Sequence, residues 1–174
     1  MEFRQGRLDF INDIDASFKD EVLTKRGELR KEWQGKIVLV KHPYLNIEYF
    51  GILHDTSLPI VKNSPLKDIR IRQAINYGFN RKKMMLYIRN SIGTPAESGF
   101  IPAGLPSFDS SKVIGYHYDP GKALELLKGA GYPNGTGLPV IKLITIPIYA
   151  EIASYIASEL QQVGIKIQVE TVQK

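Results

Sequence analysis

The sequence predicts an α/β fold in which a mixed sheet is flanked by helices. Three observations lead to this prediction: short apolar runs with the period of strands, longer segments with the period of helices, and a strand–helix–strand unit near the C-terminal end. With 174 residues, of which 43% are hydrophobic and 24% charged, the chain has the size and composition of one packed domain.

The N-terminal residues are expected to form short elements. Residues 1–7 have the pattern of a helix end, and residues 8–11 that of a short strand. Two short polar helices are expected at residues 16–23 and 28–34. Trp33, the single tryptophan, is expected to seal an edge of the core, and stacking on a ligand is the alternative.

Two strands of one sheet are expected next. Residues 37–40 are a compact apolar run, and residues 45–52 begin with alternating apolar and polar side chains after a break at His42 and Pro43. This alternation has the period of a half-covered strand.

A central helix is expected at residues 66–79. Ser64 and Pro65 suit its start, because serine caps an unpaired N–H and proline has none to leave unpaired. Asp68 and Arg72 lie one turn apart and are expected to brace the helix without binding a ligand. Its apolar face contains Ile71, Ala74, Ile75 and Gly78.

Asn80 is expected to start a second helix, which a long loop follows at residues 91–106. Three prolines and three glycines among these 16 residues exclude a regular element. Long ordered loops often carry function, and a rigid surface wrap is the alternative.

The C-terminal third is expected to contain a helix and then a βαβ unit. Asp119 and Pro120 start the helix, which ends near Gly131. Residues 140–146 and 165–169 have strand patterns on either side of a helical one, which permits a parallel crossover. The predicted core contains Ile71, Ile75, Leu126, Ile152, Ile156 and Leu160.

Composition and motifs give no support for catalysis. The absence of cysteine excludes disulfides, zinc–cysteine sites, iron–sulfur clusters and thiol nucleophiles. The three histidines lack metal-ligand spacing, and no serine-nucleophile or phosphate-binding motif is present. The net charge is +5, but the basic residues form no dense block, which argues against nucleic-acid binding. We therefore predict no catalytic residue, no metal ligand and no cofactor.

Three stretches carry a resemblance to one family. They are residues 65–81 (PLKDIRIRQAINYGFNR), 118–133 (YDPGKALELLKGAGYP) and 160–167 (LQQVGIKI). In this order they resemble the family 5 extracellular solute-binding proteins of ABC transporters, the group that binds oligopeptides, dipeptides and nickel. With further matches in GRLDF at residues 6–10 and IPAGLP at residues 101–106, the resemblance covers most of the chain.

The resemblance implies a part of the C-terminal lobe of a periplasmic-binding-protein-like II fold. Family members are longer and have a first lobe before the position of Gly6, so residues 1–174 are expected to be a single partial domain, a fragment of the second lobe. The sequence shows no secretion signal at Met1 and no run of about 18 apolar residues that would span a bilayer. Such a pattern suits an internal piece of a secreted or lipid-anchored parent.

For the full-length parent, the resemblance implies a non-catalytic substrate-binding component of an ABC transporter that imports peptides or a similar small solute. Its partners would be that solute and ABC permease subunits, with no nucleic acid. It would be a lipoprotein, periplasmic or extracellular and membrane-associated. A basic nucleic-acid or protein-interaction module, with steeply salt-dependent binding, is the alternative. An enzyme without a visible motif is the third hypothesis.

Ligand contacts are expected at Tyr149, Thr145 and Phe50. The loop from Thr145 to Tyr149 joins the C-terminal end of a strand to a helix N-terminus, where ligands usually bind in α/β units. Tyr149 is the favoured side chain, and a core-edge aromatic is the alternative. Family members tend to carry an asparagine where Tyr49 and Phe50 stand, so this chain departs from the pattern there. The acidic residue that anchors the ligand amino group in peptide-binding members would lie beyond Lys174.

The isolated chain is expected to bind no family ligand with useful affinity. One wall of a cleft leaves much of the ligand in water, while the full loss of translational freedom still opposes binding. Self-association is expected through the sheet edge at residues 165–169 and the apolar surface around Phe50 and Tyr149.

Overall fold

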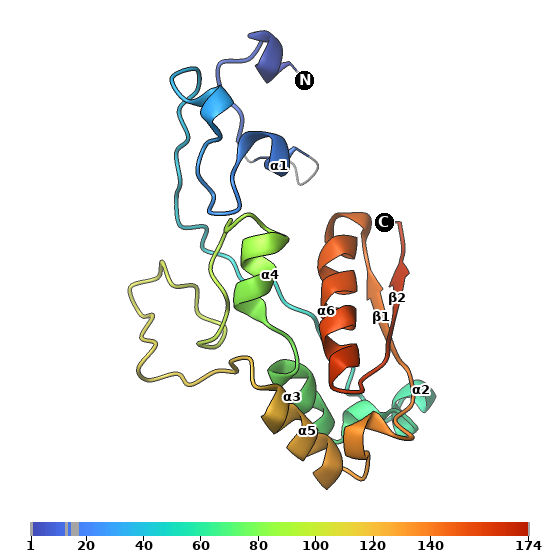
Figure 1. Ribbon diagram of the computed structural model, residues 1–174. Coiled ribbons are helices and arrows are strands. Elements are labelled where there is room, and N and C mark those ends of the chain that lie inside the picture. The colour runs from blue at the N-terminus through green and yellow to red at the C-terminus, as the bar shows by residue number, and fades with distance from the viewer. Residues whose placement is uncertain (1, 13, 15–17, 174) are drawn as a thin grey trace.

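The computed structural model describes residues 2–12, 14 and 18–173. Its helices and strands are α1 (Lys19–Val22), α2 (Pro59–Lys62), α3 (Ile69–Tyr77), α4 (Arg81–Tyr87), α5 (Pro120–Gly129), β1 (Ile141–Thr145), α6 (Ala150–Gln162) and β2 (Ile167–Thr171). Single 3-10 turns occur at Phe3–Gln5, Lys31–Trp33, Pro65–Lys67, Pro133–Gly135 and Pro147–Tyr149. Figure 1 shows α3 and α5 side by side at one end of the molecule and the N-terminal residues at the other.

The C-terminal βαβ unit forms, but its second strand begins two residues later than the predicted 165–169, because Ile165 N donates to the Leu160 carbonyl in the turn after α6. β1 and β2 pair in parallel with Ile141 opposite Ile167, and α6 connects them. The core-facing side of α6 buries Ile152, Ile156 and Leu160. Gly164 follows this helix with φ +87°, and a Cβ atom there would lie 2.1 Å from the Asn134 carbonyl oxygen. Only glycine fits this close backbone approach.

The sheet is smaller than the sequence predicts. Residues 37–40 and 45–52 are irregular and pair with no strand in the described part of the chain. Val38 and Val40 are 88% and 62% exposed. A strand needs a neighbour to satisfy its backbone N–H and C=O groups, and an alternating pattern does not supply one. The short strand expected at residues 8–11 is also absent, so the α/β class holds with a two-stranded parallel sheet.

The core lies where α3, α5 and α6 meet the two strands (Figure 1). Four of the six predicted core residues are buried, while Ile75 and Leu126 are partly buried and pack against them. Gly78 follows α3, and a Cβ atom there would lie 2.7 Å from Leu160 Cδ2. The absence of a side chain at Gly78 therefore lets the end of α3 approach α6 closely.

The predicted central helix is divided into a 3-10 turn and α3. Ser64 Oγ accepts a hydrogen bond from Leu66 N, and Asp68 then caps α3 by accepting one from Arg70 N at 2.8 Å. The expected brace between Asp68 and Arg72 does not form. Asp68 pairs with Arg70 at 2.6 Å, because a capping carboxylate lies beside the first turn. Arg72 donates instead to the carbonyls of residues 66 and 67.

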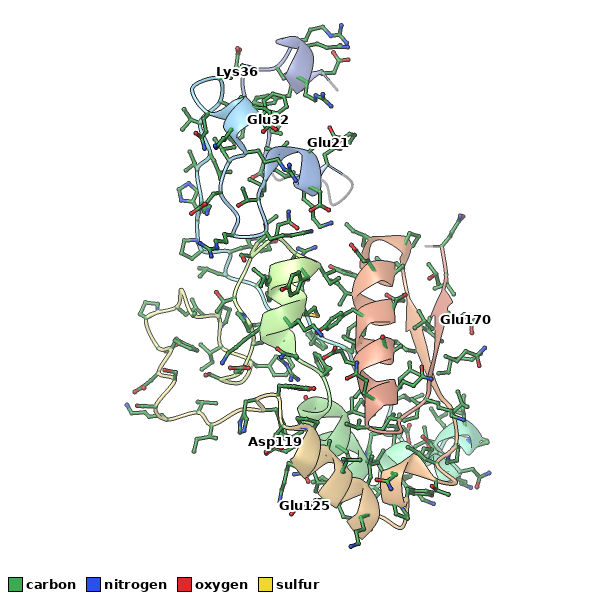
Figure 2. All side chains as sticks on the ribbon, in the orientation of Figure 1. Glu21, Glu32, Lys36, Asp119, Glu125 and Glu170 are labelled. Carbon is green, nitrogen blue, oxygen red and sulfur yellow. The ribbon has the colours of Figure 1, made fainter. Side chains whose placement is uncertain are left out.

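The remaining helix starts agree with the sequence. Asn80 accepts a hydrogen bond from Lys83 N, and Asp119 accepts one from Lys122 N. Residues 91–106 contain no helix or strand, as expected. Figure 2 shows Asp119 at the start of α5 and Glu125 on this helix, at the end of the molecule opposite the N-terminal residues.

The N-terminal helices are shorter than expected. The helix predicted at 16–23 is the single turn α1, with residues 16 and 17 outside the described part, and the one at 28–34 is a 3-10 turn. Trp33 is half-buried but does not reach the core cluster of the described residues. Its Nε1 donates to the Glu21 carbonyl at 3.0 Å, so it stabilises α1 locally. None of the described helices is long and apolar enough to cross a membrane.

Candidate functional site

Thr145, the last residue of β1, is buried where the chain turns towards α6. Thr145 is 7% exposed, and its carbonyl accepts a hydrogen bond from Val172 N at 2.8 Å. The 3-10 turn Pro147–Tyr149 then leads into α6, whose N-terminus receives no side-chain cap. The backbone N–H groups in the first turn of α6 therefore receive no hydrogen bond acceptor from a capping side chain.

Tyr149 lies at the edge of the core and reaches the segment before Phe50. Its ring is half-buried against the core cluster, and its hydroxyl donates to Glu48 Oε1 at 3.2 Å. Burial, together with the nearby Glu48 carboxylate, raises the pKa of Tyr149, so the phenol stays protonated and available as a donor. The contact joins the start of α6 to residues 44–54.

An open groove of about 460 Å³ lies beside α3. Phe50 lines it and is 40% exposed, whereas Thr145 and Tyr149 lie outside it. The structure therefore brings one of the three predicted site residues to the groove. A second, Tyr149, bonds to Glu48, which precedes the groove-lining Tyr49 in the chain but does not itself line the groove. The groove is lined by Tyr49, Phe50, Gly51, Ile52 and His54, by Ile69, Arg72, Gln73 and Asn76 of α3, and by Phe100 and Tyr116.

Aromatic rings form much of the groove wall. The rings of Tyr49 and Phe100 meet edge to face with centroids 5.2 Å apart, and those of Tyr116 and Tyr77 at 5.1 Å. Such rings offer large apolar faces at a small entropic cost on binding. The groove is thus suited to apolar or planar parts of a ligand.

The polar groups of the groove are partly engaged by the chain itself. Arg72 Nη1 donates to two backbone carbonyls at 2.8 and 3.0 Å. The Asn76 amide donates to the Arg72 carbonyl and accepts from Arg81 Nη2 at 2.9 Å. Within residues 2–12, 14 and 18–173, no group of three acidic or histidine side chains could hold a metal ion. The groove can therefore bind by shape, stacking and a few hydrogen bonds.

Most of the groove was not predicted from the sequence. The sequence indicated Phe50 but treated Arg72 as a brace and the loop containing Phe100 as a wrap or a functional loop. Tyr49, Phe100 and Tyr116 come together only through tertiary packing, which no local pattern records.

Comparisons with known sequences and solved structures all match bacterial binding proteins. The sequence model of the family described as "Bacterial extracellular solute-binding proteins, family 5 Middle" matches residues 1–174. The chain is 35% identical over 138 residues to the glutathione-binding protein GsiB of Pectobacterium atrosepticum, covering 79% of this chain and 25% of that protein. For GsiB of Escherichia coli K12 the identity is 35% over 109 residues, 63% of this chain and 21% of the relative. The chain thus spans about a quarter of the length of these relatives.

Solved structures give the same result for the fold. The periplasmic binding protein DppA of Helicobacter pylori, in complex with the peptide STSA, aligns with a TM-score of 0.67 at 22% identity. The alignment covers 99% of this chain and 30% of the DppA chain. The PBP AgaA from A.tumefacien R10, in complex with agropinic acid, aligns with a TM-score of 0.55 at 31% identity, over 63% of this chain and 22% of that one.

Proposed function

Because the chain belongs to the bacterial extracellular solute-binding proteins of family 5, we propose that it is part of the non-catalytic solute-binding component of an ABC transporter. The observation that carries this proposal is the family match over residues 1–174. DppA, which covers 99% of the chain in structure, is described as an ABC transporter-associated periplasmic binding protein. The chain would then be a partial domain in the second lobe of a longer protein.

The proposed solute is a peptide or a similar small molecule. The relatives with 35% identity are named for glutathione, itself a peptide, and the DppA structure holds a tetrapeptide. The aromatic groove beside α3 supports this choice, since peptides present apolar side chains and planar amide groups. Permease subunits of the transporter would be the protein partners, and the parent would be a periplasmic or extracellular, membrane-associated lipoprotein.

Three residues are proposed to contact or support the solute. Phe50 would supply an aromatic face from the groove wall, and Tyr149 a phenolic donor once its bond to Glu48 is exchanged. Thr145 is buried, so its proposed part is to fix the strand end from which the turn to Tyr149 starts. A second lobe would close over these groups, and ligand contacts would stabilise the closed state.

Substitution in the full-length protein tests this site. Phe50→Ala should weaken the binding of a peptide library by about 5- to 30-fold in isothermal titration, because one aromatic contact is worth about 1–2 kcal/mol. Phe10→Ala is the matched control, since Phe10 is 76% exposed and lies outside the groove. Equal affinities for the two variants would contradict the assignment of the groove.

The role of Tyr149 is tested by removing only its hydroxyl. Tyr149→Phe should weaken the same binding by about fivefold, the value of one hydrogen bond, while Tyr87→Phe on α4 should leave it unchanged. Tyr87 is 54% exposed and does not line the groove. Unchanged binding by Tyr149→Phe would assign Tyr149 to the core edge alone.

A further inference from the structure

Residues 18–36 contact the end of α4 through polar groups. Asp20 accepts hydrogen bonds from Lys25 Nζ at 2.7 Å and from Asn90 Nδ2 at 2.9 Å. Lys25 Nζ also donates to the Tyr87 carbonyl at 3.1 Å and to Asn90 Oδ1 at 3.3 Å. Asn90 has no exposed surface, so this junction is closed to water at its centre.

The backbone on both sides of this junction is fitted closely. Asn90 and Ser91 have φ values of +47° and +57°, and Ser91 Oγ donates to the Lys25 carbonyl at 2.8 Å. A Cβ atom at Gly27 would lie 2.9 Å from the Asn90 carbonyl oxygen. Two consecutive left-handed residues cost free energy, so they indicate that the contacts with residues 24–27 hold this turn in place.

One further ionic contact joins residues 18–36 to α6. Lys19 is buried, and its ammonium lies 3.3 Å from Asp20 and 3.6 Å from Glu151 in the first turn of α6. Among the described residues, the charged groups that pair with Asp20 are Lys19 and Lys25, with Glu151 beyond Lys19. Replacing either lysine would remove a positive charge that stabilises the ionised Asp20 carboxylate.

Apolar packing contributes little to the position of residues 18–36. The core cluster of the described residues, with the side chains packed against it, begins at Leu66, and Leu23 is the buried apolar side chain of this segment. α1 is a single turn, and the one β-bridge within residues 18–36 pairs Leu23 with Leu29. Elements this short do not persist alone in water. Figure 2 shows Glu21, Glu32 and Lys36 on this segment, at the end of the molecule away from α5.

We propose that residues 18–36 form a unit that unfolds locally while the core remains folded, and that Asp20, Lys25 and Asn90 are the latch that keeps it closed. The unit has few buried apolar contacts and is held mainly by hydrogen bonds and ion pairs. Such regions open at a lower free energy than a packed core. The latch joins residues 18–36 to the end of α4, so its opening frees the unit from α4. The ion pair with α6, between Lys19 and Glu151, lies outside the latch.

Amide hydrogen exchange with mass spectrometry tests the proposal on the 174-residue chain. The amides of residues 24, 27 and 30 form backbone hydrogen bonds inside the unit, so they report its opening. They should exchange faster than the amides of α6. Lys25→Met should speed their exchange by about 10- to 100-fold, the effect of losing charge-assisted hydrogen bonds, and should leave α6 unchanged.

A matched control separates the latch from the general effect of removing an ion pair. Lys122 lies 2.7 Å from Glu125 and is 49% exposed, while Lys25 lies 2.7 Å from Asp20 and is 46% exposed. Lys122→Met should leave exchange of the unit unchanged. Fluorescence of Trp33 gives a second readout, because opening breaks its bond to the Glu21 carbonyl.

Each outcome of these experiments either supports or overturns the latch. Faster exchange in the unit alone for Lys25→Met, with an earlier urea transition of Trp33 fluorescence than of far-UV circular dichroism, supports the latch. Exchange of the unit and α6 at equal rates would overturn it. So would a Lys25→Met variant that unfolds throughout or behaves like Lys122→Met. Ser91→Ala, which removes a single contact of the junction, should give a smaller change in the same direction.

Discussion

Gly164→Ala should destabilise the protein strongly, because two turns meet there backbone to backbone. A Cβ atom at position 164 would lie 2.1 Å from the Asn134 carbonyl oxygen, and one at Gly135 would lie 2.0 Å from the Gly164 carbonyl oxygen. Both neighbours are main-chain atoms, so no side chain can rotate away. The turn after α6 and the Pro133–Gly135 turn must separate to admit a methyl group.

Two effects add to the cost. A non-glycine residue at φ +87° is strained by about 1–3 kcal/mol. Separation of the turns also disturbs Leu138 and Ile165, which are 8% and 0% exposed. If it exposes about 40–80 Å² of apolar surface, the added cost is about 1–2 kcal/mol. The expected loss in the free energy of unfolding is therefore about 2–5 kcal/mol.

Substitutions at two other glycines distinguish the backbone strain from the separation of the turns. Urea unfolding followed by circular dichroism measures both. Gly131 has φ +90° with no atom near its Cβ position, so Gly131→Ala should cost only the strain. Gly129, the last residue of α5, has neither feature, so Gly129→Ala should be neutral or stabilise by about 0.5–1 kcal/mol. A Gly164→Ala variant that costs no more than Gly131→Ala would refute the backbone contact.

Three further predictions concern the core, pH and association. Leu160→Ala should cost about 2–5 kcal/mol in urea unfolding, because Leu160 is 1% exposed, whereas Ile114→Ala at 93% exposure should change stability by less than about 0.5 kcal/mol. The pKa of Asp20 lies well below its usual value of 3.8, first because Lys25 donates to it and then because Asn90 does. Its stabilising effect is therefore complete above about pH 5, one unit above the pKa of the unfolded state, and is lost as the pH falls towards the folded pKa. Trp33 fluorescence should show opening of residues 18–36 on acidification, less steeply in Asp20→Asn. Light scattering should show self-association of the 174-residue chain, and a monodisperse monomer would contradict the exposed sheet edge and apolar surface as association sites.

Local patterns predicted those elements whose stability is mostly local. Asn80 and Asp119 cap the helices that the sequence placed after them, because a cap and its N–H donor lie within three residues. The βαβ unit formed because its two strands pair with each other. Residues 37–40 and 45–52 also have strand-like patterns, but a strand requires a partner as well, and none lies beside them among the described residues.

The groove could be predicted only in part. Phe50 was expected to contact the ligand, and this stays a prediction. Tyr49 meets Phe100 across an irregular loop whose path no periodicity specifies. The expected pair of Asp68 and Arg72 failed for a local reason, since Arg70 lies closer to a carboxylate that already caps the helix. Spacing alone does not distinguish these partners.

The most direct test of the proposed function is a comparison of two titrations with one mixed peptide library. Isothermal titration of the full-length protein should show micromolar or tighter binding, while the 174-residue chain, which offers one open groove, should show none at the same concentrations. Absence of peptide binding by the full-length protein would contradict the proposed solute class. Micromolar binding by a monomeric 174-residue chain would contradict the claim that it supplies only one wall of the site.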